Sequence, residues 1–205
     1  MFNAPETLTA ARHASLRLNP VDDFRFAANE RQIPLVQSEL AEAAKHFPII
    51  FPQGETIQPI ALLGLRDNDN RFVDEAGRWT ADYVPAHIRR YPFIAGESGE
   101  DYVVMIDRQA PSLREDAGEP LFQEPKDSGE SAQLTERGQT AVDFLQRFQQ
   151  EITGMPQRFA PLAEQGVLVD TSLDIRRNGE IVQRVNGFRR VDRQKLANLD
   201  DATLA

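Results

Sequence analysis

Cysteine is absent from the 205 residues, which also contain only three histidines and one tryptophan. Without cysteine the chain has no disulfide, thiolate metal site, iron–sulfur cluster or cysteine nucleophile. No apolar run approaches the roughly 20 residues that span a bilayer, so we expect no transmembrane helix. The amino-terminal segment also lacks the basic start and apolar run of a secretory signal. We therefore expect a cytoplasmic protein.

The charge of the chain is acidic and unevenly distributed. The net charge of −9 disfavours general binding to the phosphate backbone of nucleic acids. Residues 97–136 carry eleven acidic side chains against three basic ones, whereas residues 171–205 carry seven basic side chains against five acidic ones. Two interpretations stay open: these are solvated faces, or the basic region meets an acidic partner or ligand.

Motifs for common chemistries are also missing. The sequence contains no G-x-G-x-x-G and no Walker A loop. "GESGE" at 96–100 lies in an expected polar turn, which excludes a nucleophile elbow. The segment "DNDNRFVDEAGR" places Phe72 and Arg78 where a calcium loop needs glycine and glutamate. The histidines have no partner at metal-ligand spacing. We predict no catalytic residue, no metal and no cofactor.

Alternating and turn-forming patterns predict an α+β fold with a mainly antiparallel sheet, hairpins, one longer helix and a few short helices. Asn178-Gly179 between two alternating runs predicts a type I′ hairpin turn. Two prolines bound "FPIIFP" at 47–52, which predicts an edge or the end of a strand. Further strands are expected at 33–36, 60–66 and 101–108, a hairpin loop at 74–77, and a long polar loop at 109–133.

Helices are expected where apolar residues recur at helical spacing. Ser38 is the expected N-cap of a helix to residue 47. A longer helix over 134–152 should end at Gly154 and Pro156, before a separate short helix at 157–164. Asp192 is expected to cap a terminal turn. We expect residues 1–30 to form a loosely packed arm and residues 31–205 a single domain.

One segment, residues 70–94, combines the only tryptophan with tyrosines, arginines and a histidine. Arginine recognises carboxylates and phosphates, and the aromatic side chains add large amphipathic surfaces. This pattern predicts a ligand or partner site at Arg78, Trp79, Tyr83, His87, Arg89, Arg90 and Tyr91. In the alternative interpretation, Trp79 and Phe93 belong to the core and the arginines pair with the acidic loop.

The chain resembles the bacterial SapC family at "FPIIFP", "IALLGLRDNDNRFVDEAGRW", "YVPAHIRRYPF" and "GEPLF". That family takes its name from a protein linked to bacterial surface layers (S-layers), and the peptide-transporter permease of the same name is unrelated. The resemblance implies an accessory role in uptake or modification at the cell surface or outer membrane. It supplies no catalytic residues.

Two hypotheses about function follow. The first is a non-enzymatic accessory protein that uses the Arg/aromatic segment to hold a protein partner or a small anionic ligand. The second is an enzyme or small-molecule-binding protein whose site assembles around Trp79, His87, Arg89 and Arg90. A pocket lined by these side chains would favour the second hypothesis, and a flat patch the first. The sequence leaves the oligomeric state open.

Overall fold

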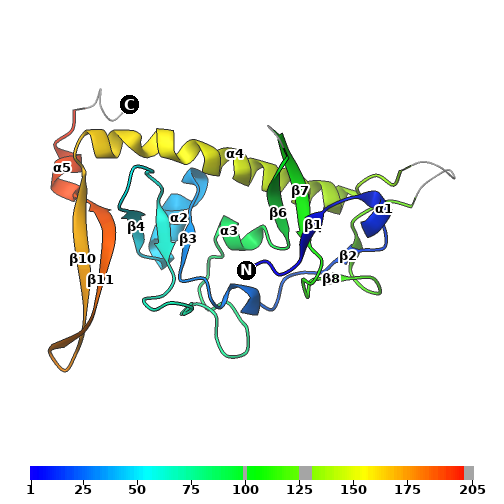
Figure 1. Ribbon diagram of the computed structural model, residues 1–205, viewed down its shortest axis with the longest axis horizontal. Coiled ribbons are helices and arrows are strands. Elements are labelled where there is room, and N and C mark those ends of the chain that lie inside the picture. The colour runs from blue at the N-terminus through cyan, green and yellow to red at the C-terminus, as the bar shows by residue number, and fades with distance from the viewer. Residues whose placement is uncertain (99–100, 125–130, 201–205) are drawn as a thin grey trace.

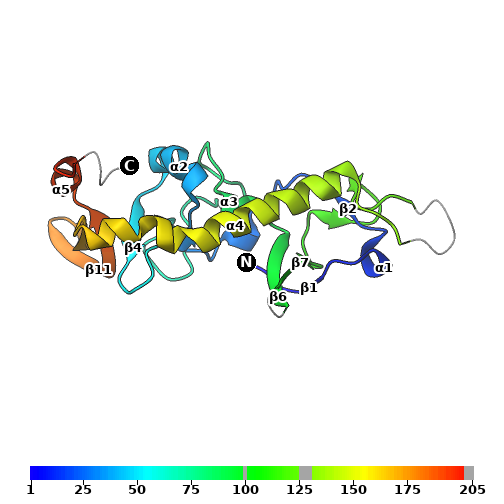
Figure 2. The same ribbon diagram turned by 90° about the horizontal axis from the view of Figure 1, so that it is seen from above.

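The computed structural model describes residues 1–98, 101–124 and 131–200, and its elements form an elongated molecule (Figure 1). The helices are α1 (Ala10–His13), α2 (Leu40–His46), α3 (Ala86–Arg89), α4 (Glu136–Glu164) and α5 (Arg193–Ala197), with short 3₁₀ turns η1 (Arg25–Ala27) and η2 (Gln37–Glu39). Helix α4 runs lengthwise along one side of the molecule and the sheets lie beneath it (Figures 1 and 2). The long helix therefore extends over most of the length of the molecule.

The strands pair antiparallel in three small sheets, which confirms the predicted α+β class. One sheet has the order β10-β11-β4-β5-β3, formed by Leu168–Arg177, Glu180–Val191, Ile49–Pro52, Ile60–Leu62 and Gln32–Pro34. A second has the order β1-β7-β6, formed by Pro5–Thr7, Asp101–Asp107 and Phe93–Ser98. The third has the order β8-β2-β9, formed by Leu113–Arg114, Arg17–Leu18 and Glu119–Pro120.

The predicted turns and the terminal cap are present. Asn178 and Gly179 have φ values of 54° and 88°, as a type I′ turn requires. Gly77 donates its N–H to Asp74 at 2.9 Å, which closes the loop at 74–77. Asp192 accepts hydrogen bonds from the N–H groups of Gln194 and Lys195 at the start of α5. These features depend on neighbouring residues, which is why the sequence predicts them.

The prediction that the long helix ends at Gly154 and Pro156 is wrong. Helix α4 continues for 29 residues through Pro156 and Pro161. Its buried apolar residues Val142, Leu145, Phe148 and Met155 all precede Pro156, and beyond it the half-buried Phe159 lies with its ring 6.0 Å from that of Phe51 on β4. A proline inside a helix costs about 3 kcal/mol, and this packing before and after Pro156 offsets that cost.

Three other local predictions need correction. Ser38 is not an N-cap but lies inside η2, and its hydroxyl donates to Glu151 on α4 at 2.9 Å. Of the polar turn expected at "GESGE", residues 96–98 belong to β6, which pairs with β7, and residues 99–100 lie outside the described part of the chain. The loop 109–133 contains β8 and β9, which flank β2, and its residues 125–130 are likewise not described. Ser38 and the loop are held by partners distant in sequence, α4 and β2, whereas β6 pairs with the next strand along the chain.

The first thirty residues pack more closely than we expected for a loose arm. Leu16, Leu18 and Ala27 are buried in the hydrophobic clusters of the body. Strand β1 pairs with β7, and the buried carboxylate of Asp107 accepts the N–H groups of Asn3 and Ala4 at 2.9 and 3.0 Å. The division into an arm and a domain over 31–205 stays a prediction.

Candidate functional site

Helix α3 positions the arginines of the predicted site. Pro85 precedes its single turn in an extended conformation, and Arg90 ends it. The buried carboxylate of Glu39 accepts the N–H of Ala86 at 2.7 Å and the hydroxyl of Tyr83 at 2.8 Å. The start of α3 is therefore fixed to η2, which lies almost fifty residues earlier in the sequence.

Trp79 belongs to the core around β3, β5 and α2. Its ring centroid lies 5.8–6.2 Å from those of Phe24, Phe47 and Phe72, and its indole N–H donates to the carbonyl of Tyr83 at 2.8 Å. The neighbouring Arg78 is exposed and pairs with Asp74 at 2.8 Å. Neither residue contributes to a common site with the arginines of α3.

Arg89 on α3 contacts Tyr83, which precedes that helix, and donates to its hydroxyl at 3.3 Å. The guanidinium of Arg89 is 5.7 Å from the centre of the Tyr83 ring and 5.1 Å from that of Phe144 on α4. Burial, with a contribution from Glu39, raises the pKa of Tyr83 to about 12. Tyr83 is therefore protonated at neutral pH and acts as a hydrogen-bond donor to Glu39.

Arg90 and His87 face α4 and are more enclosed. The Arg90 guanidinium lies 5.2 Å from the centre of the Phe2 ring and 5.1 Å from that of Phe148. Burial lowers the pKa of Arg90 to about 10, so it stays charged at neutral pH. Burial and the Arg90 charge lower the pKa of His87 to about 3, and its buried Nδ1 has no hydrogen-bond partner. His87 is a neutral packing residue beside Phe148.

Tyr91 is buried and stacks on Phe26, with ring centroids 3.8 Å apart. Its hydroxyl donates to Asp107 at 3.3 Å, and burial raises its pKa above the ordinary value. One side of the ring still borders a cavity.

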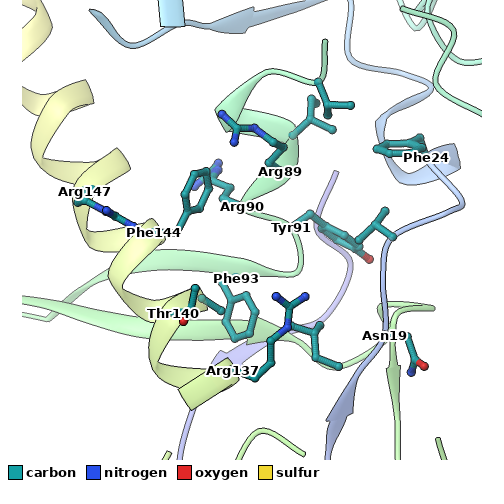
Figure 3. Close-up of a pocket in the computed structure, with 15 residues that line it drawn as sticks. Asn19, Phe24, Arg89, Arg90, Tyr91, Phe93, Arg137, Thr140, Phe144 and Arg147 are labelled. Carbon is teal, nitrogen blue, oxygen red and sulfur yellow. The ribbon is translucent and has the colours of Figure 1, made fainter. Parts of the chain in front are cut away.

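That cavity, of about 410 Å³, lies between α3 and α4 (Figure 3). Of the predicted site residues, Arg89, Arg90 and Tyr91 line it, whereas Arg78, Trp79, Tyr83 and His87 do not. The sequence prediction missed the lining residues from α4, which are Arg137, Thr140, Ala141, Phe144 and Arg147. Their spacing of three, one, three and three residues places them on one helical face, a pattern that the sequence already contains.

The pocket is strongly basic. Its four arginines are Arg89, Arg90, Arg137 and Arg147, and no aspartate or glutamate is among the described residues that line it. Within the described part of the chain, Arg137 and Arg147 form no hydrogen bond or ion pair. None of these arginines pairs with the described part of the acidic loop, whose Glu115 and Asp116 pair instead with Arg108 and Arg114.

Apart from Asn19, Tyr91 and Thr140, the remaining lining is apolar. It includes Leu18, Val21, Val84, Ile88, Phe93 and Phe144. Guanidinium groups bind carboxylate, sulfonate and phosphate oxygens through paired hydrogen bonds, and an apolar wall binds a hydrocarbon or aromatic body. The arrangement suits a ligand that has both parts.

Comparison with known proteins agrees with the motifs quoted above, since a sequence model of SapC matches residues 8–205. The chain belongs to the SapC family. No curated protein and no solved structure matches it. In this SapC-family protein the motif "YVPAHIRRYPF" supplies the turn of α3 and two pocket arginines, and "FPIIFP" supplies β4.

Among the described residues, no helix has both the length and the apolar character needed to cross a bilayer. Within residues 1–98, 101–124 and 131–200, no three side chains of the metal-binding types come together.

Proposed function

We propose that this SapC-family protein is a non-enzymatic accessory protein that binds an anionic ligand with an apolar body in the pocket between α3 and α4. The observation that carries the proposal is the meeting of four arginines with a largely apolar wall that includes no aspartate or glutamate among its described residues. Arg137 and Arg147 form no ion pair within the described part of the chain, so this pair is available to a ligand.

The alternative was an enzyme or small-molecule-binding protein whose site is built from Trp79, His87, Arg89 and Arg90. These four side chains do not line one cavity, because Trp79 packs against Phe47 and Phe72 and His87 packs against Phe148. The low pKa of His87 also leaves it a poor proton acceptor at neutral pH. Binding is therefore the function that the geometry supports better.

The proposal includes two parts that rest on the sequence alone. The family resemblance supports a role beside uptake or modification systems of the cell surface or outer membrane. Composition supports a cytoplasmic location. The ligand of the pocket would then be a small organic anion or the acidic group of a partner.

A fluorescent probe tests the ligand class. Anilinonaphthalene sulfonate combines an anion with aromatic rings, and N-phenylnaphthylamine has the same rings without the charge. We expect the sulfonate to bind at least about tenfold more tightly, because a hydrogen bond to a charged group contributes about 1.5–3 kcal/mol. Equal affinity of the two probes would contradict the proposal.

A further inference from the structure

Strand β10 is a long and regular strand at the edge of its sheet. It spans ten residues, Leu168–Arg177, and β11 is its neighbour on one side only. Between Thr171 and Leu173 the partner strand advances three residues, from Phe188 to Val185. The second irregularity has the same form, so both extra residues lie in β11 and β10 itself has no bulge.

Proteins usually protect such edges with bulges, prolines, short strands or charged side chains, because free N–H and C=O groups pair with other strands. Strand β10 is long and has no bulge or proline, and its charged side chains are of both signs, so they can pair with those of a second strand. Its central residue, Leu173, is 41% exposed, and Ile181 and Val182 on β11 are 44% and 56% exposed. The exposed apolar side chains and the open edge mark β10 as an interaction surface.

The charges along β10 are ordered in a way that indicates its partner. Two acids, Asp170 and Asp174, precede two bases, Arg176 and Arg177. The strand therefore has no net charge, but its acidic residues come first and its basic residues lie at its carboxyl end. A parallel copy would place like charges together, whereas an antiparallel copy places acids opposite bases.

Symmetry narrows the possible registers. In an antiparallel pair, residues opposite each other point to the same face of the sheet, and side chains alternate between the two faces along each strand. When a two-fold axis relates the strands, one residue must therefore lie opposite its own copy, and the axis passes between these two copies. Two registers pair nine residues of β10. An axis at Ser172 places Asp170 opposite Asp174, which is repulsive. An axis at Leu173 places Leu173 opposite itself and Asp170 opposite Arg176 at two symmetric positions.

We propose that two copies of this chain pair antiparallel through β10, about a two-fold axis at Leu173. Within the described residues, the side chain of Asp170 forms no hydrogen bond or ion pair, so it is available to a second copy. The guanidinium of Arg176 lies 3.9 Å from Asp174 of its own strand and donates one hydrogen bond, to the carbonyl of Gly179 at 3.1 Å, which leaves its other N–H groups for Asp170 of the second copy. The pairing joins the two sheets into one and removes the free edge from both.

The pairing does not involve the arginine pocket. No residue of β10 lines that pocket, and the hairpin of β10 and β11 forms one end of the elongated molecule (Figure 1). Dimer formation and ligand binding are therefore separate properties, which separate measurements can test.

Sedimentation or light scattering of the full chain measures the mass in solution. We expect twice the chain mass of 23.1 kDa for the wild type. Leu173→Lys places two lysines opposite each other and should halve the mass. The matched control, Val182→Lys, adds the same charge to the more exposed side chain on β11 and should stay dimeric. A monomeric wild type, or a dimeric Leu173→Lys, would overturn the proposal.

Charge reversal tests the register. Asp170→Arg places arginine opposite Arg176 and should give a monomer, and adding Arg176→Asp should restore the dimer. A thermal melt of each variant establishes that it is folded. The double variant carries the same Asp170 change, so a restored dimer also shows that the hairpin is intact. Failure of the double variant to dimerise would overturn this register.

Discussion

The hydroxyl of Tyr83 donates a 2.8 Å hydrogen bond to the carboxylate of Glu39. The same carboxylate accepts the N–H groups of Val36 at 3.1 Å and Ala86 at 2.7 Å, so three donors converge on one buried acid. Two of the donors come from the segment that leads into α3. Glu39 thereby holds the start of the helix that carries Arg89 and Arg90 into the pocket.

Glu39→Gln should destabilise the protein by about 1–3 kcal/mol, because an amide has one acceptor oxygen for three donors and leaves a buried N–H without a partner. Chemical denaturation at neutral pH measures the change. Glu42→Gln, on the following helix α2, removes an exposed charge that pairs with Lys45, and it should cost at most about 1 kcal/mol. Equal effects of the two substitutions would show that Glu39 does not hold α3.

Trp79→Ala should cost about 3–5 kcal/mol, as truncation of a large aromatic side chain in a core does. The reason is the loss of the contacts with Phe24, Phe47 and Phe72. Arg78→Ala is the control, since its exposed pair with Asp74 contributes about 0–1 kcal/mol. A Trp79 variant that melts like the wild type would show that the indole is a surface anchor.

Arg90 should contribute more to stability than Arg89. Arg90 lies over the rings of Phe2 and Phe148, and enclosed cation–π contacts contribute about 2 kcal/mol. The Arg89 side chain is exposed, and because exposed contacts such as those with Tyr83 and Phe144 contribute less, Arg89→Ala should cost at most about 1 kcal/mol. Denaturant titration of both alanine variants compares them directly. Two variants as stable as the wild type would show that Arg90 is a surface residue.

His87 should make stability fall in acid. Its pKa is about 3 when folded and about 6.5 when unfolded, so between these values only the unfolded state binds the proton. Stability is therefore fully present above pH 6.5 and falls with decreasing pH, by up to about 1.4 kcal/mol per pH unit. His87→Asn should reduce this dependence, as measured by denaturation midpoints from pH 7 to pH 4. Identical pH dependence in the two proteins would contradict the assignment.

The parts of the fold that the sequence predicts are those that neighbouring residues determine. Asn178-Gly179 forms its turn and Asp192 caps α5 because both use bonds within a few residues. The course of α4 through Pro156 was not predicted, because the contacts beyond this proline, such as that of Phe159 with Phe51 on β4, join residues distant in sequence. Strands β8 and β9 likewise depend on β2, which lies far earlier in the chain.

The same limit applies to the site. The sequence indicated Arg89, Arg90 and Tyr91 because arginines and aromatics cluster there, and these three line the pocket. Arg137 and Arg147 stand about fifty residues later on one face of a helix, and no local pattern shows which surface that face meets. The packing of α3 against α4 brings the two pairs of arginines together.

Binding of anilinonaphthalene sulfonate to Arg137→Ala/Arg147→Ala tests the account most directly. Both arginines are exposed and form no pair among the described residues, so the fold should remain intact. We expect the affinity to fall at least about tenfold, since a hydrogen bond to a charged group contributes about 1.5–3 kcal/mol. Arg158→Ala, on the same helix but outside the pocket, should bind like the wild type. Unchanged affinity in the double variant would show that the pocket between α3 and α4 is not the anion site.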